Sequence, residues 1–190
     1  MKSHISDLII GEAGYLIGGV GDNFFVSGNF ENYSMMNTQW NTYDAMLAFT
    51  SGADTLHELY VAGTDQGALV SGYSNNFSWG YLDIAAGNFL NLNDGNLDVG
   101  GAMYVGSITG VDLAGLSVTN VSGNGMNIYY DTANTDNTYL QGLTYELAGG
   151  GQLIGVNPAV APEPVSTALM VIGGLLLGGR IRSTRKTRNQ

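Results

Sequence analysis

The sequence predicts an all-β body, a parallel β-solenoid, followed by a single C-terminal transmembrane helix. Short β-type runs separated by Gly, Asn and Asp fill most of the chain, and helical periodicity is scarce. The only prolines, Pro158, Pro162 and Pro164, lie near the C-terminal end, so the body before them suits long hydrogen-bonded β ladders. An uncharged segment, 165–179, comes next and ends at a group of basic residues.

The expected strands are short runs with turn residues between them. Alternation of apolar and polar residues is clear from Phe89 to Asn93. The turns Asn-Asp-Gly (93–95), Gly-Asn-Gly (123–125) and Gly-Gly-Gly (149–151) supply the positive φ angles that tight turns need. The expected strands are 24–26, 46–50, 58–62, 81–85, 89–92, 103–108, 116–121, 126–130, 144–147 and 153–156.

Two architectures fit runs that recur about every 8 to 14 residues. In a parallel β-solenoid, Gly, Asn and Asp turns recur once per strand and each coil stacks on the next. In a β-sandwich, two antiparallel sheets pack face to face. The Leu-x-Leu rhythm, the low charge and the proline-free body favour the solenoid, and the sandwich is the alternative.

The C-terminal tail differs from the body in charge. Five of the six Lys and Arg residues lie in it, whereas all 16 Asp and Glu residues precede position 165. As a helix the uncharged run covers roughly 24 Å, so it spans a roughly 30 Å bilayer core only with its basic end reaching the interface. The basic end is expected in the cytoplasm and the acidic body outside. The apolar membrane residues are Val165, Leu169, Val171, Ile172, Leu175, Leu176 and Leu177, and the basic stop is Arg180, Arg182, Arg185, Lys186 and Arg188.

Three elements in the tail follow a recognisable order. Pro162-Glu163-Pro164 precedes Ser166-Thr167, a Gly/Leu-rich apolar segment and an Arg-rich end. This order resembles the PEP-CTERM sorting signal of exported bacterial proteins. Val165 is a departure, since the Ser-Thr pair usually follows the tripeptide directly. The stretch 127–154 also resembles the end of the β-helical body in many such proteins.

The resemblance implies a processing route and no enzymatic activity. A membrane protease-transpeptidase called exosortase would cut near Pro162-Glu163-Pro164 and remove the helix. The family occurs in Gram-negative bacteria that typically make exopolysaccharide. We therefore expect a protein that passes through the inner membrane and then reaches the cell surface or extracellular matrix. Association with exopolysaccharide or biofilm is the expected role.

Composition sets further bounds on domains and partners. We expect an extracellular body (1–157), a linker with the Pro-Glu-Pro motif (158–164) and the membrane and sorting segment (165–190). The chain has no cysteine, which excludes disulfides and thiol chemistry. The acidic body argues against nucleic acid, because no basic patch is present to contact phosphates.

Asp7 and Glu12 interrupt any N-terminal signal peptide, so we expect the true start to lie upstream of Met1.

Candidate chemical sites in the body are weak. His57 and Glu58 lie in an expected strand and point to opposite faces, and no nucleophile motif accompanies them. We expect His57 at the surface or at a strand edge. The segment 18–25 resembles a single calcium-binding nonapeptide, and 91–98 carries oxygen ligands without EF-hand spacing. Both are expected to be turns beside strands, and no metal or cofactor is expected.

Aromatic and acidic residues leave two further functions open. Most large aromatics of a sheet protein pack in the core, but some could form a sugar-stacking surface. Paired carboxylates could hydrolyse glycosidic bonds, although no pair stands out among the acids. The leading expectation is a non-enzymatic surface protein. The alternatives are a glycoside hydrolase-like enzyme on a β-helix scaffold and a permanently membrane-anchored adhesin. The aromatics considered are Trp40, Tyr43, Tyr73, Phe77, Trp79, Tyr81, Tyr104, Tyr129, Tyr130, Tyr139 and Tyr145.

Overall fold

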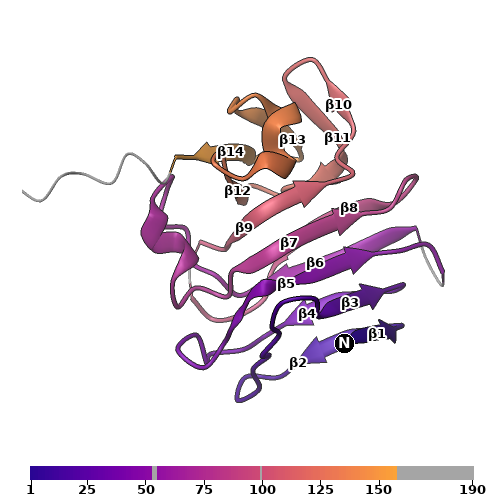
Figure 1. The fold of residues 1–190 in the computed structure, drawn as a ribbon, viewed down its shortest axis with the longest axis vertical. Helices are drawn as coiled ribbons and strands as arrows, with labels where there is room; N and C mark the ends of the chain where they lie inside the picture. The colour runs from indigo at the N-terminus through magenta and orange to yellow at the C-terminus, as the bar shows by residue number, and fades with distance from the viewer. Residues whose placement is uncertain (53–54, 99, 158–190) are drawn as a thin grey trace, which may run out of the picture. The chain divides into compact units, whose positions relative to one another are not determined.

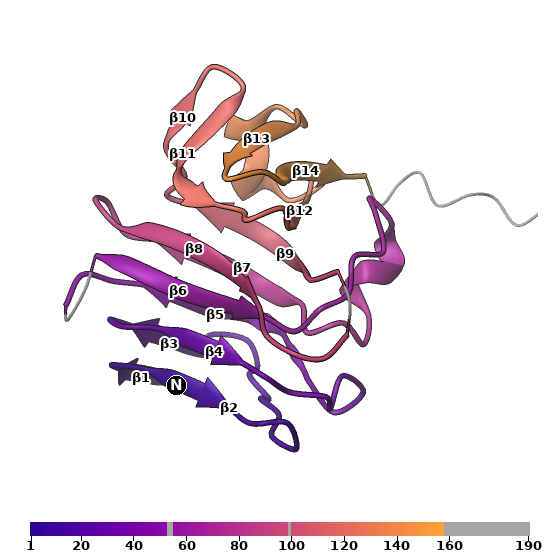
Figure 2. The same cartoon turned by 180° about the vertical axis from the view of Figure 1, so that it is seen from behind.

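The structure is a computed structural model that describes residues 1–52, 55–98 and 100–157. The described residues are mostly strand, with two short 3-10 helices, η1 (Val70–Tyr73) and η2 (Thr135–Leu140), so the predicted all-β class is confirmed (Figures 1 and 2). The strands are β1 (Lys2–Ile5), β2 (Leu8–Ile10), β3 (Asn23–Val26), β4 (Phe30–Asn32), β5 (Thr42–Phe49), β6 (Leu56–Val61), β7 (Trp79–Ile84), β8 (Phe89–Asp94), β9 (Ala102–Thr109), β10 (Leu113–Ala114), β11 (Ser117–Ser122), β12 (Asn127–Asp131), β13 (Tyr145–Ala148) and β14 (Gln152–Val156).

The strands form two parallel ladders between which the chain alternates. The first ladder runs β1-β3-β5-β7-β9-β12-β14, and the second runs β2-β4-β6-β8-β11-β13. Neighbours within each ladder pair in parallel; Phe24 of β3, for example, lies beside Leu47 of β5, which lies beside Leu82 of β7. Two pairs are antiparallel: β10 with β11, and β13 with β14, which joins the two ladders. Figure 1 shows the resulting stack of strands within the described body.

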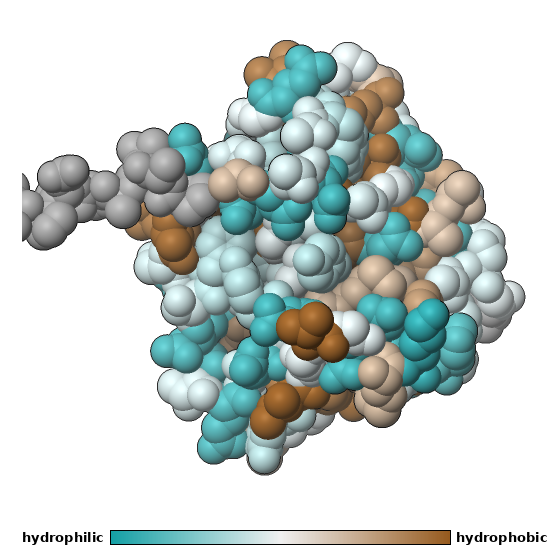
Figure 3. All heavy atoms as spheres, viewed as in Figure 1, coloured by the Kyte–Doolittle hydropathy of each residue, from teal (hydrophilic) through white to brown (hydrophobic). Residues whose placement is uncertain are grey.

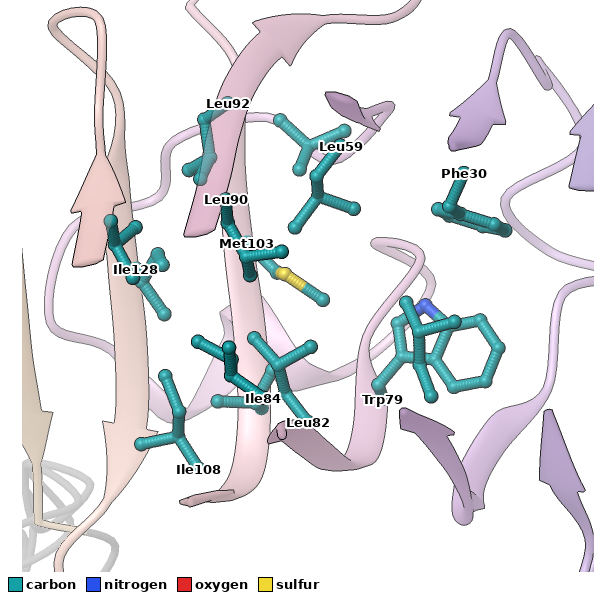
Figure 4. Close-up of a cluster of buried hydrophobic side chains, with 14 of the residues drawn as sticks. Phe30, Leu59, Trp79, Leu82, Ile84, Leu90, Leu92, Met103, Ile108 and Ile128 are labelled. Carbon is teal, nitrogen blue, oxygen red and sulfur yellow. The ribbon is translucent and has the colours of Figure 1, made fainter. Parts of the chain in front are cut away.

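A single main hydrophobic core lies between the ladders. Alternate residues point inward, so that Leu59 of β6 and Leu92 of β8 are fully buried while their neighbours face outward. The rings of Phe30 and Trp79 pack edge to face with centroids 5.7 Å apart. Figure 4 shows side chains from both ladders, including Met103 of β9, in this cluster. Inward apolar side chains from both ladders therefore hold the body together.

A second, smaller core covers the outer face of β9. Tyr104 and Tyr129 stack with ring centroids 4.5 Å apart, and Ala102 and Val156 complete the buried group. Tyr73 of η1 packs against this group from outside. Most of β9 is therefore buried on both faces, and this end of the first ladder is thicker than a single sheet.

The ten expected strands all overlap strands of the structure. The strands that the sequence did not predict are β1, β2, β4 and β10, which have two to four residues each. The expected linker (158–164) and membrane segment (165–190) lie outside the described residues. Among the residues that are described, none belongs to a helix long and apolar enough to cross a membrane.

Candidate functional site

A hollow of about 420 Å³ lies on the outer face of the first ladder. We call it the bend groove. It crosses five successive strands of the ladder, β3, β5, β7, β9 and β12, and so runs across the strands rather than along one of them. The lining residues are Val20, Gly21, Asn23, Tyr43, Asp44, Met46, Gly80, Tyr81, Gly106, Asp131 and Asn134.

An irregularity in strand pairing forms the middle of the bend groove. Thr42 lies beside Trp79, but Met46 lies beside Tyr81, so β5 advances four residues while β7 advances two. Two extra residues of β5 therefore bulge outward at this point. Gly80 fits under the bulge only because it lacks a side chain, since a Cβ atom there would lie 2.1 Å from the Tyr43 carbonyl oxygen. The bulge turns the side chains of 43 and 44 toward the groove.

Two tyrosines form the aromatic part of the groove. Tyr43 is 48% exposed and Tyr81 is 42% exposed, which is unusual for large side chains in this otherwise well-packed ladder. Partial burial, with the negative charges of Asp131 and Asp44, raises the pKa of the Tyr43 phenol. The two carboxylates therefore act on the same phenol, although 87 positions separate them in sequence. The Tyr43 phenol therefore stays a protonated donor at neutral pH.

Two carboxylates give the groove its charge. Asp44 is exposed, and Asp131 is partly buried, with its Oδ1 atom accepting the backbone N–H of Ala133 at 2.7 Å. Within the described ranges the one ion pair joins the N-terminal amine to Asp22, so neither groove carboxylate has a cationic partner there. The described body holds one Lys, Lys2, and no Arg. The groove is therefore acidic.

A second hollow of about 470 Å³ lies on the other side of Tyr43. Tyr43 lines both hollows, so both lie beside this residue. Amide and hydroxyl side chains dominate the second hollow. Asn75 and Phe77 have positive φ angles of 50° and 56°, which make the tight turn along one side of it. The side chains of this hollow come from Ile17, Thr38, Gln39, Trp40, Asn41, Thr42, Tyr43, Tyr73, Ser74, Asn75, Asn76, Phe77 and Ser78.

A row of aromatic rings supports Tyr43 from beneath. The Tyr43 ring meets Tyr73 edge to face at 6.4 Å, and Tyr73 meets Tyr104 in the same way at 5.4 Å. Tyr104 then stacks on Tyr129, whose hydroxyl donates to Asp65 at 2.7 Å. The Tyr73 hydroxyl oxygen is buried without a hydrogen-bond partner in the described part of the chain. The row therefore connects the groove with the second core.

The structure corrects one sequence-based expectation and describes the two calcium-like segments. His57 is fully buried, so its expected place at the surface or a strand edge is wrong. Within segment 91–98, Asn91 and Asn93 each donate a side-chain N–H to a Glu58 carboxylate oxygen. The segment 18–25 ends in β3. No three His, Asp or Glu side chains in the described ranges gather in a way that could hold a metal ion.

Sequence reasoning missed Asp44 and Asp131 as members of one site. It did consider Tyr43 and Tyr81, but most other aromatics it considered are buried, including Trp79 and Tyr104. The sorting residues Pro162, Glu163 and Pro164 lie outside the described residues. Asp44 and Asp131 come together only through the stacking of β5, β7, β9 and β12, which no local signal in the sequence reveals.

One face of the described body is mixed in hydropathy. Figure 3 shows, on one face, hydrophobic residues in separate spots among hydrophilic and neutral ones. No family model, curated protein or solved structure matches the chain.

Proposed function

We propose that this chain is a non-enzymatic, exported surface or matrix protein that binds exopolysaccharide through the bend groove. Its β-solenoid body does the binding, and its C-terminal segment is the address. In this proposal exosortase recognises Pro162-Glu163-Pro164, and the following apolar helix holds the chain in the inner membrane until cleavage. The Arg-rich end keeps the C-terminus in the cytoplasm.

The solenoid interpretation is supported by the parallel registers of both ladders. Each strand pairs with the next strand of its own ladder, which the chain reaches after crossing to the other ladder and back, as expected when coils stack. A β-sandwich would need mainly antiparallel pairing, which among the described strands is limited to β10–β11 and β13–β14. A stack of coils offers a long, repetitive outer face, which suits an extended polymer.

The bend groove carries the proposal of polysaccharide binding. A sugar ring has apolar C–H faces and a rim of hydroxyl groups. Exposed tyrosines such as Tyr43 and Tyr81 offer an apolar ring with a polar tip, and Asp44, Asp131 and Asn134 offer hydrogen-bonding groups beside them. A second hollow, also lined by Tyr43, offers amide and hydroxyl groups beside the same ring.

Retention of the protein on its host's exopolysaccharide tests this proposal. Tyr43→Ala and Tyr81→Ala should each lower retention, because each removes an exposed ring from the groove. Tyr15→Ala is the matched control, since Tyr15 is also 48% exposed but does not line the groove. Equal retention of all three variants and the unsubstituted chain would overturn the assignment of the groove.

A second candidate function is glycoside hydrolysis at Asp44 and Asp131. The observation in its favour is that both carboxylates line one hollow. A general acid, however, needs a water-poor environment in which it keeps its proton. Asp44 is exposed, and Asp131 already accepts the Ala133 N–H. Binding without cleavage is therefore the better supported of the two.

Release of reducing ends separates binding from hydrolysis. The protein would be incubated with the host polymer and with soluble β-glucans, and new reducing ends would be counted over time. Binding alone gives none. A steady release that both Asp44→Asn and Asp131→Asn abolish would replace the binding proposal with the enzymatic one.

A further inference from the structure

We infer that the bend groove selects polysaccharides that carry free amino groups, such as a partly N-deacetylated amino-sugar polymer. This inference rests on the proposed function, because it names the class of polymer that the same groove binds. It uses three features of the described residues: the uncompensated carboxylates, the exposed tyrosine faces and the near absence of cations.

The carboxylates favour an ammonium group over a neutral hydroxyl group. Asp44 has no hydrogen-bond partner for its side chain in the described residues, and Asp131 uses only Oδ1, for Ala133. Neither is paired with a cation there. An ammonium group is positively charged and donates three hydrogen bonds, so it satisfies a carboxylate more fully than a neutral hydroxyl group can. The pair at Asp44 and Asp131 therefore provides the charge complement that a free amine requires.

The tyrosine faces add a second attraction for the same group. A cation that lies over a tyrosine ring is drawn by the negative face of the ring. Tyr43 and Tyr81 line the groove together with the two carboxylates. Partial burial and then the charges of Asp131 and Asp44 raise the pKa of Tyr43, which agrees with their shared place in the lining of the groove. An amino sugar thus meets both a ring and a negative charge at one position.

An anionic polymer fits the groove poorly. Uronate or sulfate groups would face Asp44 and Asp131 without a cation to balance them. Lys2, the one Lys or Arg of the described body, does not line either hollow. Neutral glucans meet no repulsion, but they gain nothing from the carboxylates. The expected order of affinity is cationic amino sugar, then neutral sugar, then acidic sugar.

Calorimetric titration with four defined hexamers tests the order. The probes are hexameric glucosamine, hexameric N-acetylglucosamine, cellohexaose and hexagalacturonate, each in buffer at pH 5.5 and low salt. Hexameric glucosamine should bind tightest. An exposed carboxylate–ammonium pair accounts for about a two- to fivefold effect, so Asp44→Asn and Asp131→Asn should each weaken its binding by that factor. Binding should also weaken as salt rises.

A matched control separates a specific groove from general attraction to an acidic protein. Asp98 is exposed and does not line the groove, so Asp98→Asn removes one negative charge elsewhere. It should leave the affinity for hexameric glucosamine unchanged. An equal loss in Asp98→Asn and Asp44→Asn would overturn the inference, because attraction would then depend on net charge alone.

The remaining outcomes distinguish the inference from the function on which it rests. Equal or tighter binding of cellohexaose or the acetylated hexamer, with loss in Tyr43→Ala, overturns amino-group selection and keeps polysaccharide binding. Preference for hexagalacturonate also overturns the selection. Absence of binding to all four hexamers and to the host polymer overturns both. Unchanged circular dichroism spectra establish that each variant is folded.

Discussion

The Nε2 atom of His57 lies 2.9 Å from the Oδ1 atom of Asn88 in the interior of the body. The other ring nitrogen, Nδ1, lies 2.6 Å from the carbonyl oxygen of Gly28. The Asn88 amide nitrogen in turn donates to the Ala85 carbonyl and the Ser51 hydroxyl. His57 of β6 therefore links the segment at Gly28 with the segment at Asn88, and these contacts explain its burial.

Replacing His57 should destabilise the body markedly. His57→Leu leaves the Gly28 carbonyl without its imidazole partner and leaves Asn88 Oδ1 with the Ser51 hydroxyl alone, and a buried unsatisfied group costs about 1–3 kcal/mol. Urea unfolding followed by circular dichroism measures the loss. His4→Leu is the control, because His4 is exposed and only stacks on Phe25. Equal midpoints for both variants would show that the buried contacts contribute nothing.

Gly80 should be intolerant of a side chain. A Cβ atom there would lie 2.1 Å from the Tyr43 carbonyl oxygen, so Gly80→Ala must displace the bulge of β5, at a cost of about 1–3 kcal/mol. Thermal unfolding measures the loss. Gly19→Ala is the control, since a Cβ at Gly19 meets nothing within 4 Å. Because the bulge holds Tyr43, retention on polysaccharide should fall as well. A variant as stable as Gly19→Ala would contradict the tight fit.

The phenols should titrate in two groups. A hydrogen bond between Tyr33 and Glu31 raises the pKa of Tyr33 to about 12. Burial raises the pKa of Tyr130 and of Tyr139 to about 12. The folded chain keeps these protons while the unfolded chain loses them near pH 10. The contribution of these phenols to stability is therefore constant below about pH 10 and falls between about pH 10 and pH 12.

Absorbance at 295 nm against pH measures the phenol titration, with circular dichroism recorded in parallel. Only part of the 11 tyrosines should ionise near pH 10, and the rest should follow at higher pH or with loss of the fold. Ionisation of all 11 near pH 10 in a chain that keeps its strand signal would contradict the burial described for them. Free tyrosine amide in the same buffers gives the reference curve.

The strands were largely predictable because each carries a local signal. Runs such as 89–92 and 103–108 combine β-forming residues with Gly, Asn or Asp at their ends. β2 and β4 have only three residues, too few for an alternating pattern to emerge, and Phe30 is the one large apolar residue of β4. The bend groove was not predictable, since it depends on the register shift between Thr42 and Met46. That shift arises from packing over Gly80, which looks like any other strand glycine in the sequence.

The burial of His57 was likewise not predictable from the sequence. A lone polar residue in a strand is more often exposed than buried, so sequence reasoning favoured the surface. Its burial depends on Gly28 and Asn88, which lie 29 and 31 positions away. A separation of this size joins neighbouring strands of one ladder, and the sequence has no strict repeat from which that length could be read. The partners of His57 were therefore not predictable before the strand registers were known.

The sorting proposal makes a prediction that is independent of the groove. Replacing Pro162, Glu163 and Pro164 together by alanine should leave the folding of the body unchanged, because all three follow the last described strand. The variant should remain in the inner membrane with its Arg-rich end intact, since the processing enzyme would have no motif to recognise. Intact mass and C-terminal peptide sequence, recorded for each cell fraction of the native host, measure this.

Pro158→Ala is the control and should be cut and delivered normally. Normal surface delivery of the triple variant would overturn the sorting proposal, while an uncut tail in the unsubstituted protein would make the helix a permanent anchor.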